Sequence, residues 1–243
     1  MQIDLVVLKT AKYGVSEGGD TVEVVERPAG GLTAVMVDGQ GSGPAAKNIS
    51  SSVATKAAGL IAEGVRDGAA ARAVHDYLRT HRRAKVQASL TIISADLAER
   101  TLVTSRNSPC PVLVVGPEGQ VTIEDVEALT IGVHRMVRPV VTQHPLLPCG
   151  GAVTFTDGVL NAGKRLASAL DLDRLVNLVE ANWLEGARAT AHAVLEAALG
   201  AYEGPPGDDV TVVVLKIAAD GDRTVREMHV TYPLAGFPGE GAR

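Results

Sequence analysis

The chain has 243 residues, which is long enough for one large domain or two small ones. Its net charge of −5 and its pI near 5.7 lack the basic character of a general nucleic-acid-binding protein. Aromatic residues make up only 3% of it, which leaves little material for the stacking platforms that bind single-stranded nucleic acid. No apolar run approaches the roughly 18 to 20 uncharged residues of a membrane span. Cys110 and Cys149 are too few for a disulfide framework or a zinc site. We therefore expect a soluble, cytoplasmic protein that binds neither nucleic acid nor membrane.

The predicted elements fall into blocks along the chain. Runs of alternating or β-branched residues predict strands at residues 3–8, 21–27, 32–37, 86–95, 101–105, 111–115, 151–156, 210–217 and 225–231. Helical spacing predicts helices at residues 44–66, 69–82, 171–183 and 186–200. Because strands and helices come in blocks and do not alternate one by one, the pattern favours an α+β fold with mainly antiparallel sheets.

No internal repeat, low-complexity segment or long linker divides the chain. We therefore expect a single domain over residues 1–235. The last residues, 236–243, are Gly-rich and polar, and we expect them to form a flexible tail.

Three aspartates stand at the ends of predicted strands. Asp38 directly follows the strand predicted at 32–37 and precedes Gly39, and Asp157 directly follows the strand predicted at 151–156 and precedes Gly158. Asp208 comes just before the last buried run. If these strands pack side by side, three carboxylates meet at one end of a sheet and repel one another. Divalent cations relieve such repulsion, and ligation by oxygen alone favours Mg²⁺ or Mn²⁺ over zinc. The alternative that these residues leave open is a set of separate turn and cap aspartates.

Six segments, in chain order, resemble motifs of the PPM (type 2C) metal-dependent serine/threonine phosphatases, in particular the bacterial SpoIIE-like branch that regulates sigma-factor pathways. They are EGGD at 17–20, VMVDGQGSG at 35–43, SRNSPCPVL at 105–113, LTIGV at 129–133, TFTDGV at 154–159 and GDDVTVVV at 207–214. The shared order makes the resemblance specific, and it covers most of the chain.

The resemblance implies a two-sheet antiparallel β-sandwich flanked by helices on both faces, with two Mn²⁺ or Mg²⁺ ions bound at one end. Asp38 would bridge the two ions, and the carbonyl oxygen of Gly39 would bind one of them. Asp157 and Asp208 would complete the coordination of the other ion. Asp38, Asp157 and Asp208 are therefore the expected catalytic and metal-binding carboxylates.

Three further residues are expected to surround these ligands. Asp20 would act mostly through a metal-bound water. Asp209 aligns with a family position that is usually Asn or Asp, and it would tie down the neighbouring loop. Gly158 belongs to the same motif as Asp157 and lies beside the site.

The chain departs from the family pattern at three positions. Gln40 stands where eukaryotic members have the His thought to protonate the leaving group, and Ser42 stands where many bacterial members have another His. Neither side chain is a general acid at neutral pH, so a metal-bound water would have to donate the proton. Val15 replaces the Arg with which eukaryotic members hold the phosphate. Lys12 is the candidate substitute for that Arg. Arg106 and Asn107 are expected in a turn near the site, and Asn107 is a further candidate near the phosphate.

The resemblance implies hydrolysis of phosphoserine or phosphothreonine on a regulatory protein by attack of a metal-bridging water. An anti-sigma-factor antagonist or a stressosome-type component is the expected substrate. The alternative is a catalytically weak or inactive PPM-fold regulatory module that binds a phosphoprotein without turnover. The replacements at positions 15, 40 and 42 favour this alternative, whereas retention of the metal aspartates favours the enzyme.

One basic segment lies outside these motifs. Residues 79–85, RTHRRAK, end a predicted helix that also carries His75. Cations are favourable at a helix C-terminus, so a solvated helix end explains the segment. A docking patch for an acidic partner is the alternative.

Overall fold

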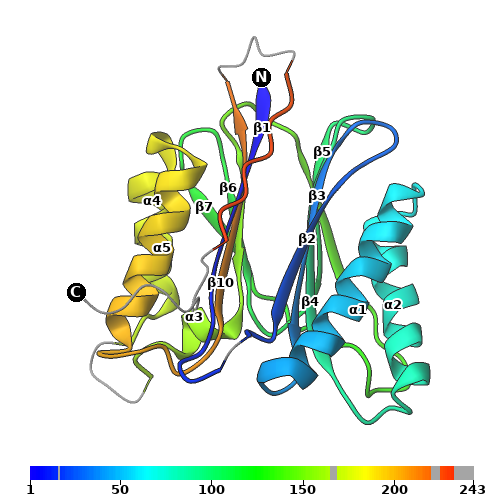
Figure 1. Ribbon diagram of the computed structural model, residues 1–243. Helices are drawn as coiled ribbons and strands as arrows, with labels where there is room; N and C mark the ends of the chain where they lie inside the picture. The colour runs from blue at the N-terminus through cyan, green and yellow to red at the C-terminus, as the bar shows by residue number, and fades with distance from the viewer. Residues whose placement is uncertain (16, 165–168, 220–224, 233–243) are drawn as a thin grey trace.

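The computed structural model describes residues 1–15, 17–164, 169–219 and 225–232. Over these residues, two five-stranded antiparallel sheets pack face to face, and helices cover the outer face of each (Figure 1). The first sheet has the order β1 (Gln2–Thr10), β10 (Val210–Ala218), β9 (Gly151–Phe155), β6 (Val112–Val115) and β7 (Val121–Glu124). The second has the order β2 (Asp20–Glu26), β3 (Gly31–Gly39), β4 (Ala88–Asp96), β5 (Thr101–Asn107) and β8 (Val140–Pro145).

The helices divide between the two outer faces. Against the second sheet lie α1 (Gly43–Ala62) and α2 (Asp67–His81). Against the first sheet lie α3 (Asp157–Asn161), α4 (Leu172–Asn182), the short 3₁₀ turn η1 (Trp183–Glu185) and α5 (Ala187–Ala201). No helix in the described ranges is long and apolar enough to cross a membrane.

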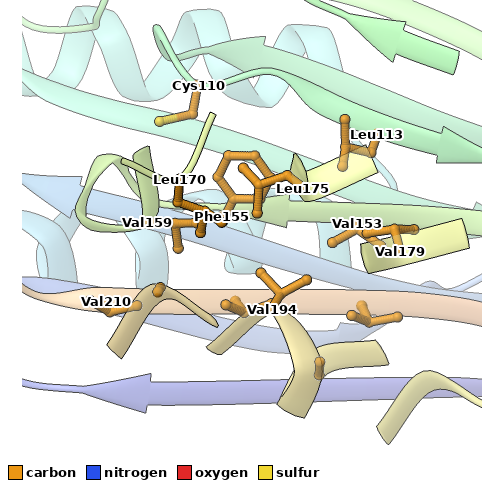
Figure 2. Close-up of a cluster of buried hydrophobic side chains, with 14 of the residues drawn as sticks. Cys110, Leu113, Val153, Phe155, Val159, Leu170, Leu175, Val179, Val194 and Val210 are labelled. Atoms are coloured by element: carbon orange, nitrogen blue, oxygen red, sulfur yellow. The ribbon is translucent and has the colours of Figure 1, made fainter. Parts of the chain in front are cut away.

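Strand alternation sets which side chains face which layer. In β3, Val35 and Val37 pack against α1 and α2, whereas Ala34 and Met36 pack between the sheets. Asp38 is in phase with Met36 and therefore faces the inter-sheet space at the end of the strand. The same alternation in β9 turns Phe155 toward the α4 and α5 layer, as Figure 2 shows.

The predicted α+β sandwich with helices on both faces is confirmed, but several local predictions were wrong. The strand predicted at 225–231 is absent, since residues 225–232 have no strand and Met228 and Val230 are exposed. The helix predicted to reach residue 66 ends at Ala62, because Gly64 has a left-handed φ of +91°. Strands β7 and β8 were not predicted. The expected tail at 236–243 lies outside the described residues.

Asp157 follows β9 as predicted, and it is the first residue of helix α3. Another prediction near the site was wrong. Arg106 and Asn107 belong to β5 and not to a turn, and the turn follows them at Ser108.

Candidate metal centre

Asp20 and Asp38 bring two carboxylates together at one end of the sandwich. They are direct cross-strand partners: Asp20 is the first residue of β2, and Asp38 is the last residue but one of β3. Side chains of such partners point to the same face of a sheet, here the inter-sheet face. The Asp20 carboxylate is only 2% exposed, and it accepts hydrogen bonds from the Oγ1 atoms of Thr156 (2.9 Å) and Thr211 (2.6 Å). Asp20 thus links the two sheets.

Asp157 reaches the same end of the molecule from the first sheet. It begins α3 directly after Thr156, and it lines a small pocket together with Asp38 and Ser108. Gly158 allows this approach, because a Cβ atom there would lie 2.0 Å from the carbonyl oxygen of Asp209. The chain segment before β10 is therefore in direct contact with the start of α3.

Asp208 and Asp209 have different environments although they are adjacent. The Asp209 carboxylate is buried and accepts hydrogen bonds from the backbone N–H groups of Lys12 (2.7 Å) and Gly19 (2.6 Å), so it holds the loop before β2. The Asp208 carboxylate is partly exposed, and its Oδ1 accepts only the N–H of Asp209 among the described contacts, at 3.0 Å. Asp208 is therefore the freer of the two carboxylates.

Burial and the neighbouring carboxylates raise the pKa values of three of these aspartates. The pKa of Asp38 is raised to about 8, first by burial and then by the charges of Asp20, Asp157, Asp208 and Asp209. Burial also raises the pKa of Asp20 to about 6, against the two threonine hydrogen bonds that lower it. The pKa of Asp157 is raised by burial and by Asp208. A cation would favour the ionised form of all these groups.

The donor set fits a hard divalent cation, although the side chains do not yet enclose one. The acidic side chains at this end offer carboxylate oxygens, and Gly39 beside Asp38 offers a carbonyl oxygen; these are the ligands that Mg²⁺ or Mn²⁺ prefers. Within the described ranges, however, no group of three or more His, Cys, Asp or Glu side chains is arranged to hold a metal ion as it stands. The carboxylates are gathered at one end of the sheets but do not converge on one point.

The Gly-rich turn after β3 brings α1 against the strand end. A Cβ atom on Gly39 would lie 2.3 Å from the carbonyl oxygen of Ala46, so only glycine allows this contact. Gln40 is exposed, and its Oε1 accepts the N–H of Gln87 at 3.0 Å. Ser42 is exposed at the N-cap of α1 and makes no side-chain capping bond.

The two predicted phosphate-binding residues have other contacts. Lys12 is tied to Asp209 through its backbone. The Asn107 side chain is buried, and its Nδ2 donates to the carbonyl oxygens of Leu129 (3.0 Å) and Arg138 (3.4 Å). Asn107 therefore anchors the loop between β7 and β8.

Two lysines that sequence reasoning missed lie beside the cluster. The Nζ atoms of Lys9 and Lys47 both donate to the carbonyl oxygen of Asp20, at 2.7 and 3.0 Å. Desolvation and the charge of Lys47 lower the pKa of Lys9. Strand alternation carried a signal for Lys9, because it is in phase with the inter-sheet residue Val7. Lys47 had no such signal, since only the packing of α1 brings it to this edge.

This architecture is that of PPM (PP2C) phosphatase domains. The family model for stage II sporulation protein E (SpoIIE) matches residues 28–218, and the chain belongs to that family. No curated protein matches the sequence.

Solved structures share the fold at low sequence identity. The phosphatase domain of SpoIIE from Bacillus subtilis, solved with a fragment of its regulatory domain, is 19% identical with a TM-score of 0.77, over 90% of this chain and 64% of that one. RsbX in complex with magnesium is 13% identical with a TM-score of 0.69, over 89% of this chain and 96% of RsbX. The RsbU and RsbW domains of a Mycobacterium tuberculosis protein are 21% identical with a TM-score of 0.71, over 90% of this chain and 61% of that one. The chain thus spans less than two thirds of the SpoIIE and RsbU–RsbW structures.

Proposed function

We propose that the chain is a metal-dependent protein phosphatase that hydrolyses phosphoserine or phosphothreonine on a regulatory protein. The observation that carries this proposal is the meeting of carboxylates from both sheets at one end of the sandwich. Asp20 and Asp38 oppose each other on β2 and β3, and Asp157 shares a pocket with Asp38. A group of like charges in a partly buried site costs stability unless a cation neutralises it, so its presence favours a metal-binding role.

Two Mn²⁺ or Mg²⁺ ions would supply an activated water and would neutralise the charge that develops at phosphorus. Asp38, the Gly39 carbonyl oxygen, Asp157 and Asp208 would hold them. Asp38 and Asp157 already line the same small pocket. Asp20 stays in place through its bonds to two threonine hydroxyls.

Other side chains near the carboxylates would attract the phosphate or hold the neighbouring loop in place. Asp209 holds the loop before β2 and so keeps Asp20 in register. Lys9 and Lys47 present ammonium groups at the edge of the cluster, where they would attract an anionic substrate. Gln40 cannot donate a proton as an acid, so solvent bound at the site would have to protonate the leaving group.

A catalytically weak or inactive regulatory module is the second candidate. The exposed Gln40 and Ser42 favour it, since both stand where active relatives are expected to have histidine. Such a module would bind a phosphoprotein at the same end of the fold and would not turn it over.

The substrate and the setting are part of the proposal. The solved structures with a similar fold include the RsbU and RsbW domains and a structure from a study of the bacterial stressosome. These likenesses support an anti-sigma-factor antagonist or a stressosome-type component as the phosphorylated partner. We also propose that residues 1–235 act as one domain in the cytoplasm.

Hydrolysis of p-nitrophenyl phosphate by the purified protein tests the reaction. We expect turnover with Mn²⁺ or Mg²⁺, none with EDTA, and a loss of at least about 100-fold in kcat for Asp38→Asn and Asp208→Asn. Asp173→Asn is the control, because this aspartate is exposed on α4. Full metal-dependent turnover in Asp38→Asn would refute the proposal. Metal binding by calorimetry with no turnover would favour the regulatory module.

A further inference from the structure

The C-terminal end of α2 and the second half of the loop between β7 and β8 carry a concentration of positive charge, whereas the first half of that loop carries Asp125 and Glu127. We call residues 79–87 and 129–138 the basic rim. These two segments hold six of the 23 Lys and Arg residues in a chain with a net charge of −5, and they contain no Asp or Glu. The cations are Arg79, Arg82, Arg83, Lys85, Arg135 and Arg138, and His81 and His134 lie among them.

The two segments of the basic rim form one surface. Ile131 pairs with Ala88 through reciprocal backbone hydrogen bonds of 2.9 and 3.1 Å. The N–H of Gly132 donates to Nδ1 of the buried His75 at 3.1 Å. Gly132 has a φ of +107°, and a Cβ atom there would lie 2.4 Å from the carbonyl oxygen of Val86. The loop therefore packs directly on the chain that leaves α2.

Five of the six rim cations are exposed, Arg79 being half-buried, and they are held on an ordered backbone. Arg82, Arg83 and Lys85 are exposed after the last turn of α2, where the N–H of Ala84 donates to the carbonyl oxygen of Arg79 at 2.8 Å. Arg83 and Ala84 have left-handed φ values of +52° and +56°, which non-glycine residues rarely adopt. Over the described ranges, no carboxylate lies within 4.0 Å of the charged nitrogens of the rim. Among the described residues, no carboxylate therefore forms an ion pair with the rim cations.

Apolar side chains are interspersed with these charges. Met136 is 74% exposed, Leu129 is 46% exposed and Val133 is 37% exposed. Arginine and methionine are enriched in protein–protein interfaces, and exposed apolar side chains at such a surface gain from burial by a partner. The rim thus combines the attraction and the contact area that a protein partner needs.

The basic rim borders the candidate metal centre. Gln87, at its inner end, exchanges hydrogen bonds with Gln40: its N–H donates to the Gln40 side chain at 3.0 Å and its carbonyl oxygen accepts the Gln40 N–H at 3.2 Å. The next residue, Ala88, is the β4 partner of Gly39. In Figure 1 the C-terminal end of α2 lies at the same lower end of the molecule as α3 and the start of α1. A protein bound on the rim would therefore reach the carboxylates.

We propose that the basic rim docks the acidic surface that flanks the phosphorylated residue of the substrate protein. This inference rests on the proposed function and names the chemistry of its substrate: a phosphoserine or phosphothreonine with Asp or Glu and an apolar side chain nearby. The carboxylate cluster itself repels acidic groups, so a separate positive surface beside it steers such a substrate toward the site.

Binding of three synthetic phosphoserine peptides, with acidic, neutral or basic flanks, tests the proposal. Fluorescence anisotropy is measured in EDTA, where the proposed reaction does not run, so the result does not depend on turnover. We expect the acidic peptide to bind more tightly than the other two. Its affinity should fall about 10-fold or more in Arg82→Glu/Arg135→Glu, and also between about 50 mM and 500 mM salt. Arg174→Glu/Arg188→Glu is the matched control, because both residues are exposed on the opposite helix layer.

Turnover provides the second readout. Hydrolysis of p-nitrophenyl phosphate should stay within about twofold of the wild type in the rim variant, because a small substrate does not reach the rim. Equal binding of the three peptides, or an equal loss in the control variant, would overturn the proposal. Tighter binding of a single-stranded oligonucleotide than of the acidic peptide would overturn it as well. If p-nitrophenyl phosphate is not hydrolysed but the acidic peptide binds the rim, the proposed reaction fails and the docking surface stands.

Discussion

Asp20 and Asp38 lie directly opposite each other on neighbouring antiparallel strands, and both carboxylates face the space between the sheets. Like charges in this position destabilise a strand pair. The two residues differ in how they are compensated. Asp20 accepts hydrogen bonds from Thr156 and Thr211, whereas no donor contacts the Asp38 carboxylate in the described part of the chain. Of the two carboxylates, that of Asp38 would therefore be stabilised more by a bound cation.

This asymmetry predicts how the stability of the metal-free protein depends on pH. The folded-state pKa of Asp38 is raised to about 8, above the value of about 3.9 in an unfolded chain. Between these values the folded state binds the proton more strongly, so stability falls as the pH rises from about 4 to about 8. We expect the Tm measured in EDTA to fall over this range, and to fall less in Asp38→Asn. Differential scanning calorimetry at several pH values measures both.

Added metal should remove this pH dependence in the wild type and leave it unchanged in Asp38→Asn. The control is Asp173→Asn on α4, whose Tm should follow the wild type. A Tm that rises with pH in EDTA, or equal slopes in wild type and Asp38→Asn, would contradict the assignment.

Adjacent aspartates before β10 should give opposite phenotypes. Asp209→Ala leaves the N–H groups of Lys12 and Gly19 without their acceptor, which costs about 2–4 kcal/mol of unfolding free energy. Asp208→Ala loses only the bond from the neighbouring N–H, so its stability should change by less than about 1 kcal/mol, while metal-dependent turnover is lost. Urea unfolding and p-nitrophenyl phosphate assays on both variants separate the two roles. A stable, inactive Asp209→Ala paired with an unstable, active Asp208→Ala would reverse the assignment.

Gly158 should not tolerate a methyl group. In Gly158→Ala the new Cβ would lie 2.0 Å from the Asp209 carbonyl oxygen, so α3 or the segment before β10 must shift, at a cost of more than about 2 kcal/mol. Gly200→Ala is the matched control, because it lies in α5 with no atom within 4 Å of the new Cβ. That variant should gain about 0.5–1 kcal/mol from helix propensity. Chemical denaturation compares them, and equal stability of the two variants would show that α3 adapts without strain.

Much of the fold was predictable because local patterns and tertiary packing agree. Strands such as β3 and β10 are long and β-branched, and both are buried by helices on one face and by the opposite sheet on the other. The segment at 225–231 shows the limit of such patterns. Its alternation of apolar and polar residues is typical of a strand, yet no partner strand pairs with it in the described chain. Alternation predicts a face to bury but does not supply the element that buries it.

The site was predictable to a different extent. Ordered motifs pointed to Asp38, Asp157 and Asp208, whose positions depend on strand ends that the sequence marks. Lys47 depends on the packing of α1 over the edge of β2, and nothing local to it indicates that contact. The anchoring of the β7–β8 loop by Asn107 is likewise a tertiary contact, made to backbone carbonyl oxygens that carry no sequence signal.

The paired lysines give the last prediction. An ammonium group has three donors; among the described contacts Lys9 uses one, on the carbonyl oxygen of Asp20, and Lys47 uses two, on that oxygen and on Oγ1 of Thr21. Three N–H donors therefore remain at the edge of the cluster for an anion. We expect Lys47→Met to raise the inhibition constant of inorganic phosphate about 10-fold while kcat changes less. Lys56→Met is the control, because Lys56 is exposed on the same helix and lies over the Tyr77 ring. If Lys47→Met lowers Tm and leaves phosphate inhibition unchanged, the pair serves only to join β1 and α1 to the start of β2.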